Sequence, residues 1–268
     1  MKASANFFRW ATVLIAAAGA AATGLVPALA QGATPAIACA APTELVRLAN
    51  PLKRVARRLA AGEPLTIVAI GSSSTAGAGA SAQANSYPSR LAVELKSLFP
   101  QATINVINRG VGGEVAQDMI ARFERDVFAN KPDLVLWQVG SNSVLRGQPV
   151  RDANATLHEG LKRLRAAGTD VVLINPQYAP KVIAKRDADL MVDLIDAAAR
   201  QSDVDLFQRF AVMRHWRLTE GIPYSAFLSP DELHMNDWSY GCIARLLAFA
   251  IQEAATRQTV TATAGSRR

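Results

Sequence analysis

The sequence predicts an α/β fold, in which a single three-layer α/β/α domain surrounds a parallel sheet of about five strands. Short apolar runs alternate with helical stretches along the chain, and this alternation is typical of a parallel sheet covered by helices. Most of the short runs are apolar on both faces, as a sheet covered on both sides requires. Of the 268 residues, 50% are hydrophobic and 19% are charged, which argues against disorder over most of the length.

The expected strands are the apolar runs at residues 65–70, 103–108, 133–139, 171–175 and 204–210. The first run ends at Gly71 and has the length and composition of a buried strand. The fourth run stops at Pro176, which cannot continue the hydrogen bonding of a central strand. No internal repeat and no linker to a second domain interrupts the series.

The expected helices are residues 43–61, 88–98, 114–129, 153–167, 187–200 and 238–254. In the third of these, four apolar side chains recur at spacings that suit one buried face: Met119, Ile120, Phe123 and Val127. Asp152 is expected to cap the start of the fourth helix. Gly168 follows its last turn, where glycine commonly ends a helix.

Residues 1–30 are expected to be a cleaved secretory signal peptide. Lys2 and Arg9 precede an uncharged stretch at 11–30, which ends in a small-x-small pattern at 28–30. A membrane anchor is the alternative, but alanines dominate the stretch, and two glycines and a proline interrupt it. The organisation is therefore a signal peptide (1–30), a linker (31–42), the domain (43–256) and a disordered tail (257–268). The protein is expected to be secreted or periplasmic, with no stable membrane span after cleavage.

The formal charge of +7 is a weak indication of an anionic partner. Loss of Lys2 and Arg9 with the signal peptide lowers it from +7 to +5. The remaining basic residues are scattered, or lie on helical stretches such as 52–58, where a solvated helix face explains them. Nucleic acid is therefore not an expected partner.

The chain has two cysteines and three histidines. This count excludes a disulfide-stapled miniprotein and a cysteine-rich zinc module, and leaves little material for a histidine metal site. An oxidising compartment would permit a bond between Cys39 and Cys242, which would tether the N-terminal arm to the last helix. Two free thiols are the alternative.

Polar and glycine-rich segments follow the first three strands, at residues 71–79 (GSSSTAGAG), 108–114 (NRGVGGE) and 140–143 (GSNS). A fourth segment, 229–237 (SPDELHMND), precedes the last helix. These segments do not match the known nucleotide-binding fingerprints. No lysine follows Gly77, as a P-loop requires, and Val115 interrupts the dinucleotide-binding pattern. Thr75 occupies the second glycine position of the α/β-hydrolase elbow. Sites in open α/β sheets form beyond the carboxyl ends of the strands, so the first three segments are candidates.

Together the four segments resemble the blocks of the SGNH hydrolases, also called GDSL esterases. The first resembles the block that carries the nucleophile, at Ser73, and the second the block whose glycine falls on Gly113. The third has its asparagine at Asn142, and the last matches Asp-x-x-His with Asp231 and His234. The resemblance spans residues 65 to about 255 and implies a flavodoxin-like fold. Two positions depart from the pattern, because serines replace aspartates at Ser72 and Ser143.

The resemblance implies a serine esterase that forms an acyl-serine intermediate. Ser73 would be the nucleophile, His234 its base and Asp231 the group that orients the base. The oxyanion hole would consist of the Ser73 and Gly113 backbone N–H groups and the Asn142 amide. No metal or other cofactor is expected.

Three further residues, Gln177, Tyr178 and Trp216, are expected to contact substrate, and segment 211–230 is long enough for a substrate loop or lid. The substrate would be a carboxylic ester, possibly an acetyl ester, of a small molecule, glycan or lipid. Two alternatives remain open. An O-acyltransferase acting on glycans outside the cytoplasm would use the same residues, and a binding module would keep the fold without turnover. The sequence does not indicate the oligomeric state.

Overall fold

The computed structural model describes residues 37–265 as a domain built on one all-parallel sheet. Its five strands are β1 (Leu65–Gly71), β2 (Ile104–Gly110), β3 (Leu134–Gln138), β4 (Asp170–Ile174) and β5 (Asp205–Phe207), in the order β2-β1-β3-β4-β5. The predicted fold class is confirmed. The expected signal peptide, the first part of the linker (31–36) and the last three residues (266–268) lie outside the described residues.

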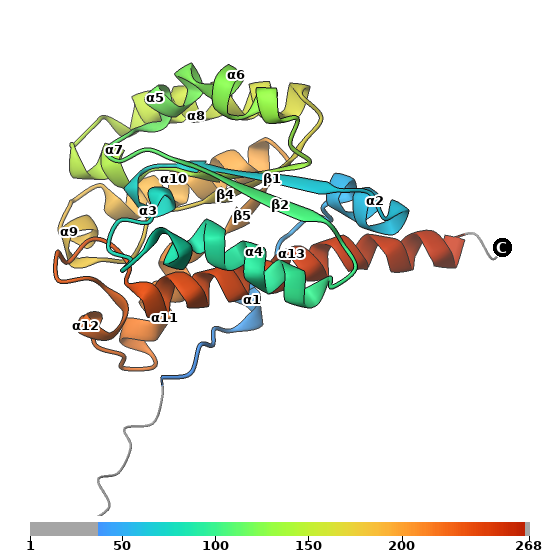
Figure 1. The fold of residues 1–268 in the computed structure, drawn as a ribbon. Coiled ribbons are helices and arrows are strands. Elements are labelled where there is room, and N and C mark those ends of the chain that lie inside the picture. The colour runs from blue at the N-terminus through green and yellow to red at the C-terminus, as the bar shows by residue number, and fades with distance from the viewer. Residues whose placement is uncertain (1–36, 266–268) are drawn as a thin grey trace, which may run out of the picture. The chain divides into compact units, whose positions relative to one another are not determined.

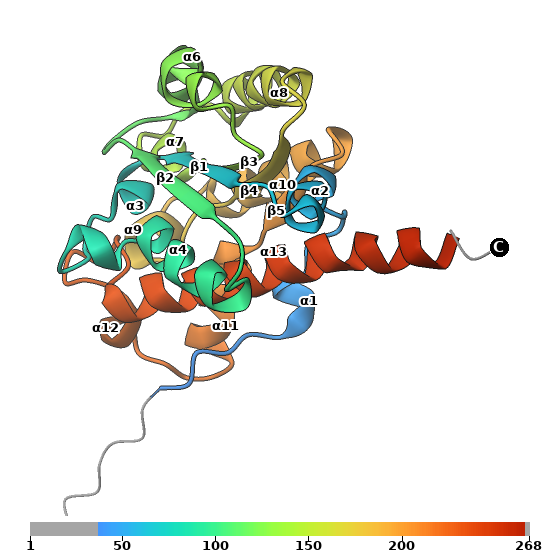
Figure 2. The same ribbon diagram turned by 45° about the vertical axis from the view of Figure 1, so that its right-hand side comes forward.

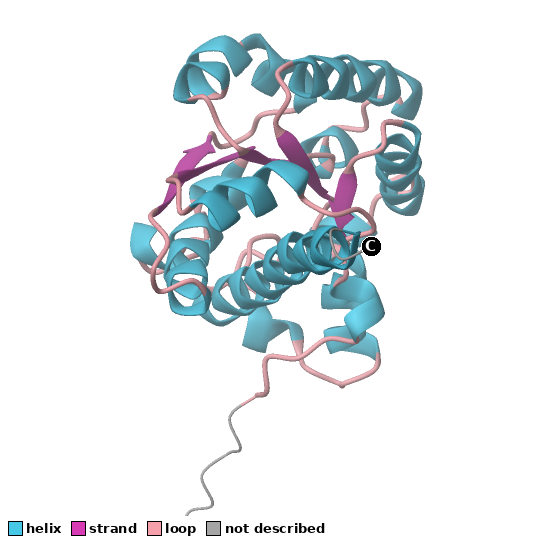
Figure 3. Cartoon of the chain, turned by 90° about the vertical axis from the view of Figure 1, so that its right-hand side faces the viewer, coloured by secondary structure: helices cyan, strands magenta, loops and turns pink. Residues whose placement is uncertain are grey.

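Helices cover both faces of this sheet (Figures 1 and 2). One face carries α5 (Ala116–Ala121), α6 (Phe123–Asp126), α8 (Val150–Ala166) and α10 (Ala188–Gln201), and the other carries α4 (Tyr87–Leu98) and α13 (Asp237–Gly265). Figure 3 shows the strands enclosed between the two helical layers. The inner strand β3 is buried along its whole length, as a strand covered on both sides must be.

The core lies on both sides of the sheet, and the fully buried Trp137 of β3 is one of its two largest side chains. Its indole packs edge-on against Phe123, and its Nε1 points at the sulfur of Met119, 3.3 Å away. Helix α8 crosses this indole at Gly160, where a Cβ atom would lie 2.2 Å from the ring. The helical layer that contains α8 therefore packs directly against the sheet.

The strand order reverses between β1 and β3, because β2 lies on one side of β1 and the later strands lie on the other. Ligand sites in such sheets form at this switch point, beyond the carboxyl ends of the strands. Four short helices lie at that edge: α3 (Ser73–Ala76), α7 (Ser141–Leu145), α9 (Pro180–Ile183) and α12 (Tyr224–Phe227).

Two predicted helices are divided in the structure. The stretch 43–61 forms α1 (Thr43–Val46) and α2 (Lys53–Ala61), since Pro51 lies between them and has no N–H to continue a helix. The stretch 114–129 forms α5, α6 and the 3-10 turn η2 (Phe128–Asn130). The break falls at Arg122, whose buried guanidinium bonds Glu114 and Asp126.

Three other expectations require correction. Helix α8 begins at Val150 after Pro149, so Asp152 lies in its first turn and does not cap it. The segment 211–230, expected as a loop or lid, folds mostly into α11 (Arg209–Leu218) and α12, with Trp216 and Phe227 in the core. Helix α13 continues to Gly265, through most of the expected tail at 257–268. A further 3-10 turn, η1, covers Gln83–Asn85.

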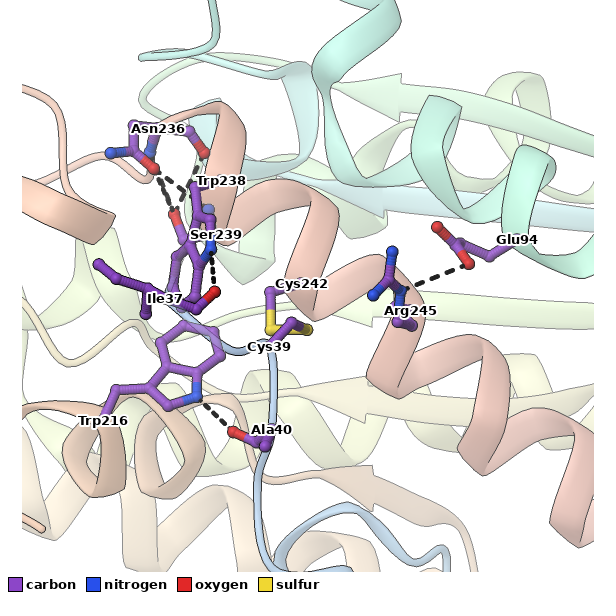
Figure 4. The surroundings of a disulfide bond; sticks show 10 residues. All are labelled: Ile37, Cys39, Ala40, Glu94, Trp216, Asn236, Trp238, Ser239, Cys242 and Arg245. Carbon is purple, nitrogen blue, oxygen red and sulfur yellow. Dashed lines mark hydrogen bonds and ion pairs between the residues drawn. A yellow bond between two sulfur atoms is a disulfide. The ribbon is translucent and has the colours of Figure 1, made fainter. Parts of the chain in front are cut away.

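A disulfide joins Cys39 to Cys242 on α13, which confirms the bond that the sequence permits (Figure 4). The two Cα atoms are 5.4 Å apart, and 203 positions separate the residues in the sequence. Hydrogen bonds to the same N-terminal segment come from the indole of Trp216, at 2.8 Å from the Ala40 carbonyl, and from that of Trp238. Within residues 37–265, no helix is both long enough and apolar enough to cross a membrane.

We expect the Cys39→Ala/Cys242→Ala double variant to unfold at a lower urea concentration, with a loss of about 2–4 kcal/mol in the free energy of unfolding. The bond closes a loop of most of the domain, and opening that loop increases the entropy of the unfolded chain. Reduction of the wild-type protein should cause the same loss. Equal stability of the oxidised, reduced and double-variant proteins would contradict this expectation.

Asp205 at the start of β5 is buried and accepts the backbone N–H of Asn50 at 2.8 Å. Burial raises the pKa of Asp205 to about 6 against the lowering effect of its backbone hydrogen bonds. Because the folded chain holds this proton to a higher pH than the unfolded chain does, the stabilisation is complete below about pH 4. It is lost as the pH rises through 6.

Urea unfolding of the wild type and Asp205→Asn between pH 4 and 8 should isolate this effect. We expect the wild type to lose about 2 kcal/mol relative to the variant over that range. The asparagine keeps an oxygen for the Asn50 N–H and does not titrate. A stability difference that stays constant with pH would contradict the assignment.

Candidate active site

Ser73 is the first residue of α3, directly beyond the end of β1. This short helix lies against the end of β2, because Gly110 has no side chain: a Cβ atom there would lie 2.1 Å from the Ala76 nitrogen. Gly71 permits a similar approach of the Thr75 side chain. As the first helical residue, Ser73 has a backbone N–H with no acceptor inside the helix.

Ser73, His234 and Asp231 form a continuous hydrogen-bonded chain. The Ser73 Oγ lies 2.8 Å from His234 Nε2, and His234 Nδ1 lies 2.5 Å from Asp231 Oδ2. The imidazole of His234 bridges the hydroxyl and the carboxylate. Ser73 and His234 are 161 positions apart in the sequence. This is the arrangement in which an imidazole takes a proton from a serine while a carboxylate fixes its tautomer.

The loop before α13 holds the Asp231 carboxylate in place. Its Oδ1 accepts the Ser229 hydroxyl at 2.7 Å and the backbone N–H groups of Leu233 and His234 at 3.0 and 2.9 Å. Burial alone would raise the pKa of Asp231, but the hydrogen bonds from His234, Ser229 and Leu233 outweigh it and hold this pKa well below its usual range. Asp231 is therefore a carboxylate at neutral pH.

The three groups lie at an open edge of the domain. The side chain of His234 is 16% exposed and that of Asp231 is 43% exposed, while Ser73 is partly buried.

Two further segments carry the residues predicted for the oxyanion hole. Gly113 has a φ of +81°, which glycine adopts without strain, in the turn after β2. The neighbouring Gly112 lies beside Ser73, since a Cβ atom there would be 4.0 Å from the Ser73 Cβ. Asn142 on α7 donates one amide hydrogen to the Glu114 carbonyl at 2.8 Å. That bond fixes the orientation of the amide and leaves its second N–H available to another acceptor.

The two serines that depart from the GDSL pattern are both buried. Ser72 donates its N–H and its hydroxyl to the Gln138 Oε1, both at 2.9 Å, so it faces β3 beneath the site. Ser143 lines a cavity with Val115 and Pro149. Gln138 was missed in the sequence, where it is the polar end of an otherwise apolar run.

The three residues expected to contact substrate differ in their positions. Tyr178 is half-buried and stacks on Tyr224, with ring centroids 6.3 Å apart. Gln177 and Trp216 are buried at 2% and 0% exposure, and both bond other parts of the chain. Their burial argues against the predicted substrate contact.

The other two histidines do not join the site. His158 on α8 lies between the Asn154 carbonyl and Gln201, and His215 on α11 pairs with Glu220. Among residues 37–265, no group of three or more His, Cys, Asp or Glu side chains is placed to hold a metal ion. The groups that the structure brings together at the site are the serine hydroxyl, the imidazole and the carboxylate.

Several proteins to which this chain is similar are named as esterases. An arylesterase from Vibrio mimicus is 27% identical over 158 residues, which are 57% of this chain and 75% of that protein. An acetylxylan esterase from Geobacillus stearothermophilus is 42% identical over 52 residues, which are 19% of this chain and 24% of that protein.

A solved structure gives the same picture of the fold. The crystal structure of a two-domain esterase active on acetylated mannans, with mannopentaose, superposes with a TM-score of 0.68 and 25% identity. The match covers 79% of this chain and 56% of that one, so the chain spans little more than half of the two-domain protein.

The fold and these relatives are those of SGNH-type ester hydrolases. Residues 38–257 match the model of the Non-GDSL lipase-like family, which covers almost the whole described domain. The chain belongs to the Non-GDSL lipase-like family. That name agrees with Ser72, which stands where the GDSL pattern has its aspartate.

Proposed function

We propose that the protein is an exported serine esterase that hydrolyses a carboxylic ester through an acyl-serine intermediate on Ser73. The observation that carries the proposal is the unbroken chain from the Ser73 hydroxyl through His234 to Asp231. A serine hydroxyl is a weak nucleophile at neutral pH, and a base at hydrogen-bond distance activates it by accepting its proton.

In the first half of the reaction, the Ser73 Oγ attacks the ester carbonyl carbon while its proton passes to His234 Nε2. The Asp231 carboxylate stabilises the imidazolium that forms. The carbonyl oxygen becomes an oxyanion, which would accept hydrogen bonds from the Ser73 and Gly113 backbone N–H groups and from the free Asn142 amide hydrogen. The C–O bond to the alcohol then breaks, and His234 returns its proton to the departing alcohol.

In the second half, water replaces the alcohol. His234 takes a proton from the water as its oxygen attacks the acyl carbon. Collapse of the second oxyanion breaks the bond to Ser73 Oγ, which recovers its proton from the imidazolium. The products are a carboxylic acid and the regenerated enzyme, and no metal or other cofactor takes part in these steps.

We further propose that the substrate is an acetyl ester on a glycan met outside the cytoplasm. Two relatives support the substrate class, since they are named for acetylxylan and acetylated mannans. Two features of the chain support export: the signal-like pattern at 1–30 and the disulfide, which persists in oxidising compartments.

The experiment is hydrolysis of p-nitrophenyl acetate, butyrate and octanoate, followed by acetate release from acetylated xylan and mannan. We expect turnover of the acetate ester to exceed that of the octanoate. A fluorophosphonate should label the protein on one peptide, with mass spectrometry placing the label on Ser73. A folded protein that neither reacts with the probe nor cleaves any ester would contradict the proposal and would indicate a binding module.

Product analysis distinguishes the hydrolase from an acyltransferase with the same residues. With a sugar acceptor present, the hydrolase releases free acetate and leaves the acceptor unmodified. Transfer of the acetyl group to the acceptor at a rate above that of hydrolysis would contradict hydrolysis as the main reaction.

A further inference from the structure

The residues beside the nucleophile, the oxyanion asparagine and the base all bond the same side chain, Gln177. Ser74, next to Ser73, donates its hydroxyl to Gln177 Oε1 at 3.3 Å. Ser141, next to Asn142, donates to the same oxygen at 2.8 Å. The Gln177 Nε2 donates to the carbonyl of Leu233, next to His234, at 3.2 Å.

We propose that Gln177 is a positioning residue that holds the nucleophile, the oxyanion amide and the base in register. The three segments come from the ends of β1 and β3 and from the loop before α13, and the sheet alone fixes only the first two. Gln177 follows β4, which ends at Ile174. The proposal rests on the proposed function, because it assigns a role in the same reaction.

Arg209 sets the orientation of the Gln177 amide. The Arg209 side chain is fully buried at the start of α11, and its Nη2 donates to Gln177 Oε1 at 3.0 Å. Its Nε donates to the Asn175 carbonyl at 3.0 Å. Because a guanidinium only donates hydrogen bonds, Gln177 must present its oxygen to Arg209 and the two serines, and its nitrogen to Leu233.

The buried charge indicates that this arrangement has a purpose beyond packing. Burial lowers the pKa of Arg209 to about 10, so the side chain remains charged at neutral pH. Within residues 37–265, Arg209 is paired with no carboxylate, and its Nη1 has no hydrogen-bond acceptor there. A buried charge without an opposite charge costs free energy, and the hydrogen bonds from Arg209 to Asn175 and Gln177 offset part of that cost.

The test compares Gln177→Leu with a matched control, Asp133→Asn. Asp133 is equally buried and also bonds several segments, namely Arg54, Arg58 and the Thr66 N–H, but at the opposite end of the strands. Both variants should lower the melting temperature. Below the melting range, Gln177→Leu should lower kcat for p-nitrophenyl acetate by about 10–100-fold and change KM by less than about 3-fold. Asp133→Asn should leave both constants unchanged.

Milder variants test the three contacts separately. Ser141→Ala removes one bond and should lower kcat by about 3–10-fold. Gln177→Glu keeps the acceptor oxygen for the serines and Arg209 and loses the donor to Leu233, so we expect it to recover part of the loss. Activity of Gln177→Leu within 2-fold of wild type, or equal kcat losses in Gln177→Leu and Asp133→Asn, would overturn the proposal. Equal losses in Gln177→Glu and Gln177→Leu would overturn the three-way assignment.

A spectroscopic measurement separates this proposal from the proposed function. The downfield proton resonance of the His234–Asp231 hydrogen bond reports the position of the base without turnover. We expect this resonance to broaden or shift in Gln177→Leu and to stay unchanged in Asp133→Asn. A wild-type protein without esterase activity would contradict the proposed function alone, whereas an active wild type with an unperturbed resonance in Gln177→Leu would overturn the positioning role alone.

Discussion

Ser73→Ala is expected to lower kcat for p-nitrophenyl acetate by about 10⁴–10⁶-fold without changing the melting temperature. The variant keeps the backbone N–H and the Asn142 amide but has no oxygen to form the acyl intermediate. His234→Ala should have an effect of similar size, because the serine would lose the imidazole 2.8 Å away. The measurement is steady-state hydrolysis, with circular dichroism as the check on folding.

Matched controls come from other parts of the domain. Ser97→Ala replaces an exposed serine on α4, and His158→Ala replaces a half-buried histidine on α8. Both should keep kcat within 2-fold of wild type. Ser73→Ala activity within 10-fold of wild type, in a preparation free of other esterases, would exclude Ser73 as the nucleophile.

Asn142→Ala is expected to lower kcat by about 10²–10³-fold with little change in KM. The amide is held by its bond to the Glu114 carbonyl, so its second N–H has a fixed direction. Such a donor stabilises the oxyanion more than the substrate carbonyl, and its loss therefore raises the barrier more than it weakens binding.

Asn130→Ala is the matched control for this variant, because the Asn130 amide also donates to a backbone carbonyl, that of Asp126. Asn130 lies in η2, on a different segment from the triad. We expect Asn130→Ala to lower the stability of the protein and to leave kcat unchanged. A loss confined to KM in Asn142→Ala, or a kcat loss no larger than in Asn130→Ala, would contradict the oxyanion assignment.

The sheet was predictable because its signal is local. Each strand is a short apolar run between polar segments, so all five appear in the structure within a few residues of their expected places. Helix boundaries were less predictable, because they depend on contacts that periodicity does not contain. The break at Arg122 accompanies ion pairs with Glu114 and Asp126, and the long α13 extends through residues with no apolar pattern.

The candidate site also contains residues that the sequence indicated and residues whose role it did not indicate. Ser73, Asn142 and His234 lie in blocks with a recognisable order, so the sequence could single them out as candidates, and the structure brings the serine and histidine within hydrogen-bond distance. Gln177 and Trp216 were expected to face substrate because of their place in the chain. A position beyond a strand end indicates the edge of the sheet but not the direction of the side chain, and both side chains point inward.

The contacts of Gln177 had no signal in the sequence. Ser74, Ser141 and Leu233 belong to three distant segments, and only the packed domain brings them to one amide. Arg209 was equally hidden, since arginine at a helix start is ordinarily solvated.

The single disulfide has a consequence for the order of folding. The chain contains two cysteines, so only one intramolecular pairing exists and no incorrect one competes with it. Cys39 is synthesised early and Cys242 late, and the correct bond must wait for nearly the whole domain. During that interval Cys39 can pair only with another molecule. Production of this protein should therefore be limited by intermolecular dimers of unfinished chains and not by disulfide isomerisation.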